Sequence, residues 1–229
     1  MQLVTVAGPP SAGKTSVLLH IAEALQREHS LKLGIIKFDC LSSKDRERYE
    51  SRGLLTRTGL SGNLCPDHFF VSNVEDCFQW GKQQALDLLI SESAGLCNRC
   101  SPHIAGVLAV CVIDNLSGIH TPQKVGPMLK LADVVIITKS DIVSQAEREV
   151  FAFRVRQANP SAAIVQVNGI TGQGALEVSR LFRNAASFET MEGCRLRFSM
   201  PAATCSYCLG QTRIGEDFQM GNVRKMDLS

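Results

Sequence analysis

The segment that most restricts the fold of this 229-residue chain is Gly8-Pro9-Pro10-Ser11-Ala12-Gly13-Lys14-Thr15, which matches the phosphate-loop pattern GxxxxGK[ST] at every fixed position. An apolar run precedes it and apolar residues at helical spacing follow it, so the glycines fall between a strand and a helix. The backbone N–H groups of a helix N-terminus then face the phosphates of a nucleotide. We expect Lys14 to reach the β- and γ-phosphates and the Thr15 hydroxyl to bind Mg²⁺. The nucleotide-binding residues expected here are Gly8, Ser11, Ala12, Gly13, Lys14, Thr15 and Ser16.

The bulk composition limits the classes of partner. The chain has 24 basic and 22 acidic residues and a formal net charge of +2, so no overall field points to nucleic acid or an anionic membrane. No apolar run approaches the roughly 18 residues that a membrane span needs, and no signal-peptide pattern opens the sequence. We therefore expect a cytoplasmic protein. Nine cysteines in a reducing compartment favour metal binding or burial over disulfides.

Strand-like and helix-like stretches alternate along most of the chain. The expected strands cover residues 2–7, 33–38, 85–91, 105–114, 134–137 and 163–167, and the expected helices cover 16–27, 74–82, 121–132, 144–158 and 175–186. This alternation predicts an α/β fold with a doubly wound, mostly parallel sheet of the P-loop NTPase type over residues 1–186. A small cysteine-containing extension is expected over 187–229. The charged stretch 42–57 is expected to be a solvated helix or a mobile segment, and 58–63 a turn-rich loop.

Polar residues follow several of the expected strands. Asp39 ends the second strand, Glu92-Ser93-Ala94-Gly95 follows the third, and the loop Asn168 to Gly174 follows the last. Because the carboxyl ends of parallel strands lie along one edge of a sheet, we expect these loops to converge on the nucleotide.

The tetrapeptide Thr138-Lys139-Ser140-Asp141 resembles the guanine-recognition motif [NT]KxD. The carboxylate of Asp141 can accept hydrogen bonds from the ring N–H and the exocyclic amine of guanine, a donor pair that adenine lacks. The stem of Lys139 can cover the base. The motif therefore predicts GTP and GDP as the nucleotides.

The order of these motifs over roughly residues 1 to 185 resembles the SIMIBI-class metallochaperone GTPases, namely HypB, UreG and CobW proteins. The resemblance implies that Asp39 lies near Mg²⁺ in switch I, that Glu92 holds Mg²⁺ through water or orients the attacking water, and that Gly95 senses the γ-phosphate. It implies that Gly169, Ile170 and Thr171 lie against the base. It also implies slow GTP hydrolysis and a homodimer formed across the nucleotide. The residues expected to act in hydrolysis are Lys14, Asp39 and Glu92.

Two CxxC pairs are candidates for a second, transition-metal site. Cys97/Cys100 and Cys205/Cys208 can together supply four thiolates to Zn²⁺ or an iron–sulfur cluster. The separation of about 100 residues exceeds that of a zinc ribbon, so each pair is also considered a half-site. The first pair begins two residues after Gly95, so movement of that loop with the γ-phosphate would couple nucleotide state to metal affinity.

Three further residues are weaker metal-ligand candidates. Cys65-Pro66-Asp67-His68 is similar to the Cys-Pro-His nickel motif of the urease GTPase, with Asp67 inserted, which singles out Cys65 and His68. His103 follows Cys100 by three residues. Mixed imidazole and thiolate ligands favour Ni²⁺, whereas thiolates alone favour Zn²⁺, Cu⁺ or iron–sulfur clusters.

The leading hypothesis is a GTPase that delivers a metal or a metal-bearing cofactor to a client metalloenzyme or corrinoid protein. The first alternative is a GTP-gated protein chaperone of a corrinoid enzyme, with a structural Zn²⁺ on the cysteines. A small-molecule kinase is a third hypothesis, with a lid made from the arginines of the stretch 42–57. A redox or scaffold protein is a fourth, which the complete phosphate loop disfavours.

Overall fold

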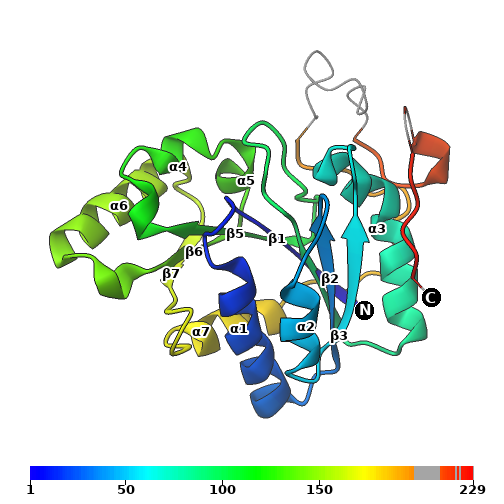
Figure 1. Cartoon of the computed structure of the whole chain (residues 1–229), viewed down its shortest axis with the longest axis horizontal. Helices are drawn as coiled ribbons and strands as arrows, with labels where there is room; N and C mark the ends of the chain where they lie inside the picture. Colours follow the sequence, from blue (N-terminus) through cyan, green and yellow to red (C-terminus); the bar gives the residue numbers. More distant parts are fainter. Residues whose placement is uncertain (199–211, 220, 222, 229) are drawn as a thin grey trace.

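The computed structural model describes residues 1–198, 212–219, 221 and 223–228 (Figure 1). Within these residues, seven strands form one sheet in the order β3-β2-β4-β1-β5-β6-β7, and each neighbouring pair is parallel. The strands are β1 (Gln2–Ala7), β2 (Leu33–Asp39), β3 (Leu55–Leu60), β4 (Leu88–Glu92), β5 (Leu108–Asp114), β6 (Val134–Thr138) and β7 (Ala163–Gln166). The predicted doubly wound parallel sheet is confirmed.

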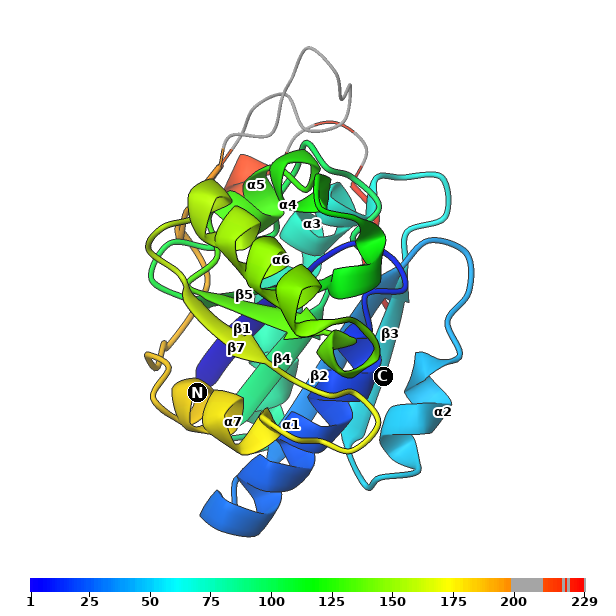
Figure 2. The same ribbon diagram turned by 90° about the vertical axis from the view of Figure 1, so that its left-hand side faces the viewer.

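Helices cover both faces of this sheet (Figure 2). They are α1 (Lys14–His29), α2 (Asp45–Glu50), α3 (Pro66–Gln83), α4 (Thr121–Lys124), α5 (Pro127–Lys130), α6 (Gln145–Ala158) and α7 (Ala175–Arg183), with 3₁₀ turns at Asn115–Ser117, Ser140–Ile142 and Glu216–Phe218. Among the described residues, no helix is long and apolar enough to cross a membrane.

The core is divided by the sheet because successive side chains of a strand point to opposite faces. Val4 and Val6 of β1 belong to the apolar layer that contains α1 and α7. Leu3 belongs to the opposite layer with α3, and Ala7 to the part of that layer with α4, α5 and α6. Each central strand is thus buried on both faces, as parallel sheets are.

The largest departure from the expected fold lies between residues 42 and 63. This stretch contains α2 and the edge strand β3, which pairs in parallel with β2. Tyr49 of α2 is fully buried. Most other residues of 42–53 are exposed, so the expectation of a solvated helix is correct there, apart from Tyr49. The expectations are wrong for residues 55–60, which form β3, while the expected turn is present at residues 62–63. The charge of Arg57 in β3 is accommodated at the sheet edge, where the half-buried guanidinium lies 5.4 Å from the ring centroid of Trp80.

Two helices also differ from their expected bounds. Helix α3 begins at Pro66, a residue whose fixed φ suits the first turn of a helix, so Cys65 to His68 form a helix N-terminus and not a loop. The expected helix 121–132 is divided into α4 and α5 at Gly126, whose φ is +68°. Ser144 caps α6 as expected, in a capping box with Glu147.

The described parts of residues 187–228 pack onto the sheet domain. Antiparallel bridges join Gln2 to Ser187, Ile104 to Leu196 and Arg195 to Arg213. The tail lies along α3 (Figure 1), where the Asn73 side chain donates to the Arg224 carbonyl at 2.9 Å and accepts from the Met226 N–H at 2.7 Å. The domain boundary at residue 187 stays a prediction.

Candidate functional site

The carboxyl edge of the sheet holds a cavity of about 420 Å³ beside the phosphate loop. It is lined by Pro10, Ser11, Gly13, Lys14, Thr15, Ser16, Lys37, Asp39, Asp45, Arg48, Glu92, Ala94 and Leu96. The structure therefore brings most of the predicted phosphate-binding residues together with Asp39 and Glu92. It adds Lys37, Asp45 and Arg48, which the sequence analysis did not single out.

The phosphate loop is closed against the segment that follows β4. A side chain on Gly8, at φ +145°, would meet the Val112 carbonyl oxygen at 2.0 Å, and one on Gly95 would meet the Gly8 carbonyl oxygen at 1.7 Å. Only glycine fits such approaches. The Lys14 ammonium donates to the carbonyls of Gly8 and Pro9 at 2.9 Å and to that of Ala94 at 3.4 Å. Burial lowers the pKa of Lys14 to about 8, against the Glu92 carboxylate, which raises it. Lys14 thus contacts both the phosphate loop and residues 93–96, which follow β4 and are called the post-β4 segment below.

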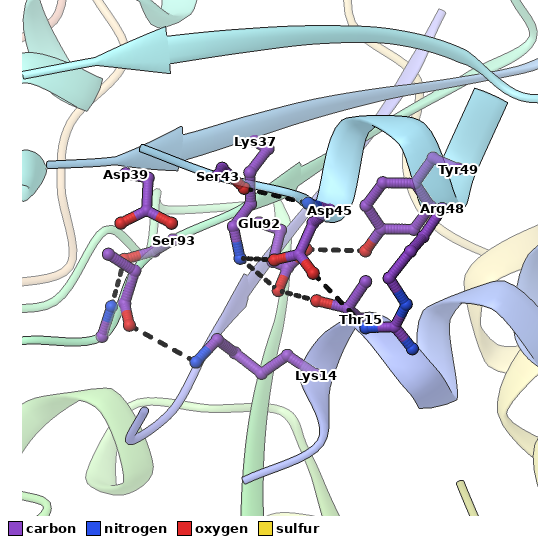
Figure 3. Close-up of polar contacts among 12 residues, drawn as sticks. Lys14, Thr15, Lys37, Asp39, Ser43, Asp45, Arg48, Tyr49, Glu92 and Ser93 are labelled. Atoms are coloured by element: carbon purple, nitrogen blue, oxygen red, sulfur yellow. Dashed lines mark hydrogen bonds and ion pairs between the residues drawn. The ribbon is translucent and has the colours of Figure 1, made fainter. Parts of the chain in front are cut away.

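Glu92 is the centre of a buried polar cluster (Figure 3). Its side chain is fully buried, and its Oε1 accepts from the Thr15 hydroxyl at 3.0 Å and from the Lys37 ammonium at 2.7 Å. Its Oε2 accepts from the Tyr49 hydroxyl at 2.6 Å. Both carboxylate oxygens are satisfied, as a buried charge requires.

Helix α2 contributes further groups to the same cavity. Lys37 forms a second ion pair with Asp45 at 3.0 Å. The Arg48 guanidinium donates to the Ser16 hydroxyl at 3.1 Å and pairs with Asp45 at 3.3 Å. The sequence does contain a signal for Lys37 that was missed: it is the lone charge in the apolar run LGIIKF, and a buried lysine is rare without a partner.

The oxygen atoms around Thr15 fit a hard cation. Mg²⁺ prefers oxygen ligands, and the Thr15 hydroxyl and the carboxylates of Asp39, Asp45 and Glu92 all line this one cavity. Asp39 is oriented by its own backbone, because its Oδ1 accepts from the Cys40 N–H at 2.8 Å.

The expected base-recognition residues lie at the ends of β6 and β7. A second cavity of about 400 Å³ is lined there by Asp141, Arg148, Asn168, Gln173 and Glu177, among others. Thr138 ties this region to the phosphate loop, since its hydroxyl donates to the Ala12 carbonyl at 2.7 Å.

The loop after β7 is held in a defined shape. Asn168 Oδ1 accepts from the Ile170 N–H at 2.8 Å and from the Thr171 N–H at 3.0 Å. Gly169 approaches α1, where an added Cβ would lie 3.2 Å from Ser16. Ile170 is 85% exposed at the tip, available to a ligand or a partner.

A thiol cluster lies directly behind the post-β4 segment. The sulfurs of Cys65 and Cys100 and a carboxylate oxygen of Asp67 lie within 4.8 Å of one another, and the Cys97 and Cys100 sulfurs are 3.4 Å apart. Burial raises the pKa of Asp67 to about 7, and hydrogen bonding to Cys65 together with burial raises that of Cys100. The four residues offer soft sulfur ligands and one oxygen, a set that suits a borderline or soft metal ion. We refer to Cys65, Asp67, Cys97 and Cys100 as the thiol cluster.

The thiol cluster differs from the ligand sets expected from the sequence. It joins Cys65 to the first CxxC pair, two features considered separate. Cys205 and Cys208 lie outside the described residues. His68 is buried in the first turn of α3 and does not belong to the group of mutually close ligand atoms.

The expectation that His103 binds a metal is contradicted. His103 is fully buried, and its ring nitrogens hydrogen-bond to the Thr5 hydroxyl at 3.0 Å and to the Met128 carbonyl at 2.9 Å. With Nε2 donating to the carbonyl, Nδ1 accepts from Thr5, and neither nitrogen is left for an ion. His103 joins β1 to α5 and is a structural residue of the core.

The buried state of His103 predicts a pH dependence of stability. Burial lowers its pKa to about 4, the Met128 carbonyl opposes this, Arg197 lowers it further and Asp133 raises it. An unfolded imidazole titrates near pH 6.5, so on acidification the unfolded chain takes up the proton first and is favoured. We expect the titration of His103 to lower the free energy of unfolding by about 3 kcal/mol as the pH falls from 7 to 4. Urea unfolding of wild type and His103→Gln across this range measures it, and equal pH slopes would contradict it.

Comparison with known proteins agrees with this geometry. The family profile described as "CobW/HypB/UreG, nucleotide-binding domain" matches residues 2–166. The chain belongs to this family. An uncharacterized protein of Methanocaldococcus jannaschii is 44% identical over 227 residues, which are 99% of this chain and 97% of that protein. The urease accessory protein UreG of Trichodesmium erythraeum is 29% identical over 213 residues, covering 82% of this chain and 96% of UreG.

Solved structures show the same CobW/HypB/UreG fold. The hydrogenase maturation factor HypB of Archaeoglobus fulgidus superposes with a TM-score of 0.63 at 22% identity, over 80% of this chain and 89% of that one. HypB of Helicobacter pylori in complex with nickel superposes with a TM-score of 0.64 at 19% identity, over 83% of this chain and 91% of that one. At these identities the likeness is one of fold.

Proposed function

We propose that this CobW/HypB/UreG-family protein binds GTP and GDP with Mg²⁺, hydrolyses GTP slowly, and uses the nucleotide state to control a metal ion bound at the thiol cluster. The metal or a metal-bearing cofactor is the cargo for a client metalloenzyme or corrinoid protein. The family assignment and the complete phosphate loop support the nucleotide part.

One contact path carries the proposed coupling. The Ser93 hydroxyl donates to Asp67 of the thiol cluster at 3.2 Å and accepts from the Gly95 N–H at 3.2 Å. The adjacent carbonyl of Ala94 accepts from Lys14. A γ-phosphate that attracts Lys14 and the Gly95 N–H would therefore displace the residues that orient Asp67. Two sites that share one short segment can bias each other's binding.

The remaining roles in hydrolysis follow from position and charge. Lys14 would neutralise the β- and γ-phosphate oxygens, while Thr15, Asp39 and Glu92 would hold Mg²⁺ and its waters. Mg²⁺, when bound, supplies charge neutralisation for phosphoryl transfer to water. Arg99, the arginine nearest in sequence to the post-β4 segment, is exposed. Slow turnover is expected when no arginine is provided to the transferred phosphate.

Nickel and zinc are the two candidate cargo ions for the thiol cluster. One structural neighbour, HypB of Helicobacter pylori, is described in complex with nickel, and UreG is a urease accessory protein. Zn²⁺ fits the same thiolates and is the practical probe.

Two exposed leucines, one lining the nucleotide cavity and one in the segment after β2, support a homodimer. Leu41 is 81% exposed and Leu96, which lines the cavity, is 55% exposed. A second copy placed across this edge would remove both side chains from water.

The small-molecule kinase alternative loses support from the structure. Arg46 pairs with Glu50 and Arg52 with Glu23, both at the surface. Of the arginines in residues 46–57, Arg48 is the one that lines the cavity. The described residues thus do not assemble the expected arginine lid.

The proposal is tested by metal affinity in two nucleotide states. We expect the Zn²⁺ affinity of anaerobically purified wild type to differ by about tenfold or more between GDP and a non-hydrolysable GTP analogue. Ser93→Ala removes the hydrogen bond to Asp67 and is expected to shrink this ratio towards one. Competition with a chromophoric chelator measures both. Stoichiometric Zn²⁺ with equal affinity in the two states would instead favour the protein chaperone of a corrinoid enzyme, with a structural zinc.

A further inference from the structure

The nucleotide cavity contains a cation that belongs to the chain itself. Lys37 of β2 is 4% exposed, and it is the register partner of Glu92 in the neighbouring parallel strand β4. Its ammonium lies 2.7 Å from Glu92 Oε1 and 3.0 Å from the Asp45 carboxylate (Figure 3). Two carboxylates on different elements therefore share one lysine.

This ammonium is next to the hydroxyl that is expected to bind Mg²⁺. The oxygen of Glu92 that binds Lys37 is the same Oε1 that accepts from Thr15, the phosphate-loop hydroxyl expected to ligate Mg²⁺. A divalent ion at Thr15 would then lie close to the Lys37 charge in a buried setting, where like charges repel more strongly than in water. Glu92 therefore cannot interact with the Lys37 ammonium and with Mg²⁺ at the same time without weakening one of the two interactions.

We propose that Lys37 is a tethered cation of the nucleotide site, which supplies positive charge to bound phosphates without Mg²⁺ and competes with Mg²⁺ for Glu92. This inference rests on the proposed nucleotide binding. It adds that Lys37 makes nucleotide binding less dependent on Mg²⁺.

A purely structural lysine would give a different result. If Lys37 did no more than neutralise Glu92 in the folded chain, its loss would lower nucleotide affinity equally with and without Mg²⁺. Competition instead predicts effects of opposite sign. Without Mg²⁺, loss of Lys37 removes a charge near the phosphates and weakens binding. With Mg²⁺ present, the same loss frees Glu92 and lowers the Mg²⁺ concentration that is needed.

The experiment measures GDP affinity by calorimetry in EDTA and across a Mg²⁺ titration. We expect Lys37→Gln to lower the affinity in EDTA by about 10- to 100-fold, the range for one charged hydrogen bond. We expect its half-saturating Mg²⁺ concentration to be about tenfold lower than that of wild type. Arg46→Gln is the matched control, because it removes a positive charge from α2 outside the cavity, and both values should stay at wild type. Lys37→Arg keeps the charge and should resemble wild type in EDTA.

The folding of each variant is measured separately from its affinity. Lys37→Gln leaves Glu92 buried without its cation, which is destabilising. Circular dichroism and thermal unfolding of each variant show which variants are folded, and Lys37→Arg, which keeps a positive charge beside Glu92, is compared under the same conditions. If wild type binds no GDP in either condition, the proposed function fails. If wild type binds GDP but the folded variants follow its Mg²⁺ dependence in parallel, the tethered-cation inference is overturned and nucleotide binding stands.

Discussion

Asp141→Asn is expected to lower the affinity for GDP and GTP by about four orders of magnitude, the scale on which a site built to hydrogen-bond a group rejects a mismatch. The carboxylate of Asp141 lines the cavity at the ends of β6 and β7. In its proposed role as the acceptor of both guanine donors, it cannot be replaced by an amide, which would turn an N–H towards one of them. Calorimetric titration with GDP measures the loss.

The same substitution is expected to raise the affinity for xanthine nucleotides. Xanthine has a carbonyl where guanine has its exocyclic amine, so the Asn N–H meets an acceptor. Glu177→Gln is the matched control, because Glu177 lines the same cavity but lies on α7, outside the tetrapeptide. Unchanged GDP affinity in Asp141→Asn would show that the base binds elsewhere.

Motifs tied to the backbone were the features that the sequence predicted best. The phosphate loop requires a strand before it and a helix after it. Its glycines stand at fixed spacings along the chain, so the motif is recognised without knowledge of distant contacts. Ser144 and Glu147 likewise define the start of α6 through contacts between near neighbours. The alternation of strands and helices then restricts the topology to a parallel sheet.

Edge strand β3 could not be recognised from its own residues. Its sequence LTRTGL lacks the continuous apolar run of a central strand, since one side of an edge strand lacks a partner strand. A solvated helix was expected where α2 lies, and most of its side chains are exposed. Its contacts with the site were not expected: Asp45 pairs with Lys37, and the Tyr49 hydroxyl donates to Glu92. The structure of such segments depends on contacts with residues far away in the sequence, and a local sequence pattern does not contain those contacts.

The thiol cluster depends on topology in the same way. Cys65 follows β3 and Cys100 follows β4, and strand β2 lies between these two in the sheet. Because β3 and β4 both run parallel to β2, the segments that follow them leave from the same edge of the sheet. Cys65 then lies at the N-cap of α3, where its sulfur comes close to that of Cys100. His103 was considered a metal ligand because it follows Cys100 by three residues. Its apolar neighbour Ile104 instead indicates a histidine in the core.

Cys65→Ser and Cys100→Ser are each expected to lower Zn²⁺ affinity by more than about 100-fold, beyond the loss caused by removing an outer-shell partner of a ligand. The hydroxyl of serine is a poor ligand for a soft or borderline ion, and Asp67 cannot replace a thiolate. Competition with a chelator under anaerobic conditions measures the affinity. Cys194→Ser is the control, because Cys194 lies outside the cluster and its sulfur contacts the Thr190 carbonyl at 3.9 Å.

The variant Cys205→Ser/Cys208→Ser decides between the two ligand sets. If the metal is held by Cys65, Cys97, Cys100 and Asp67, this variant should retain most of the Zn²⁺ affinity, because the cluster is already complete within residues 65–100. If the two CxxC pairs form the site, it should lose the metal while Cys65→Ser keeps it. In that case Asp67 would be a buried carboxylate bound to Ser93 with no role towards the ion, and the contact path from Lys14 through Ala94 would end short of the metal.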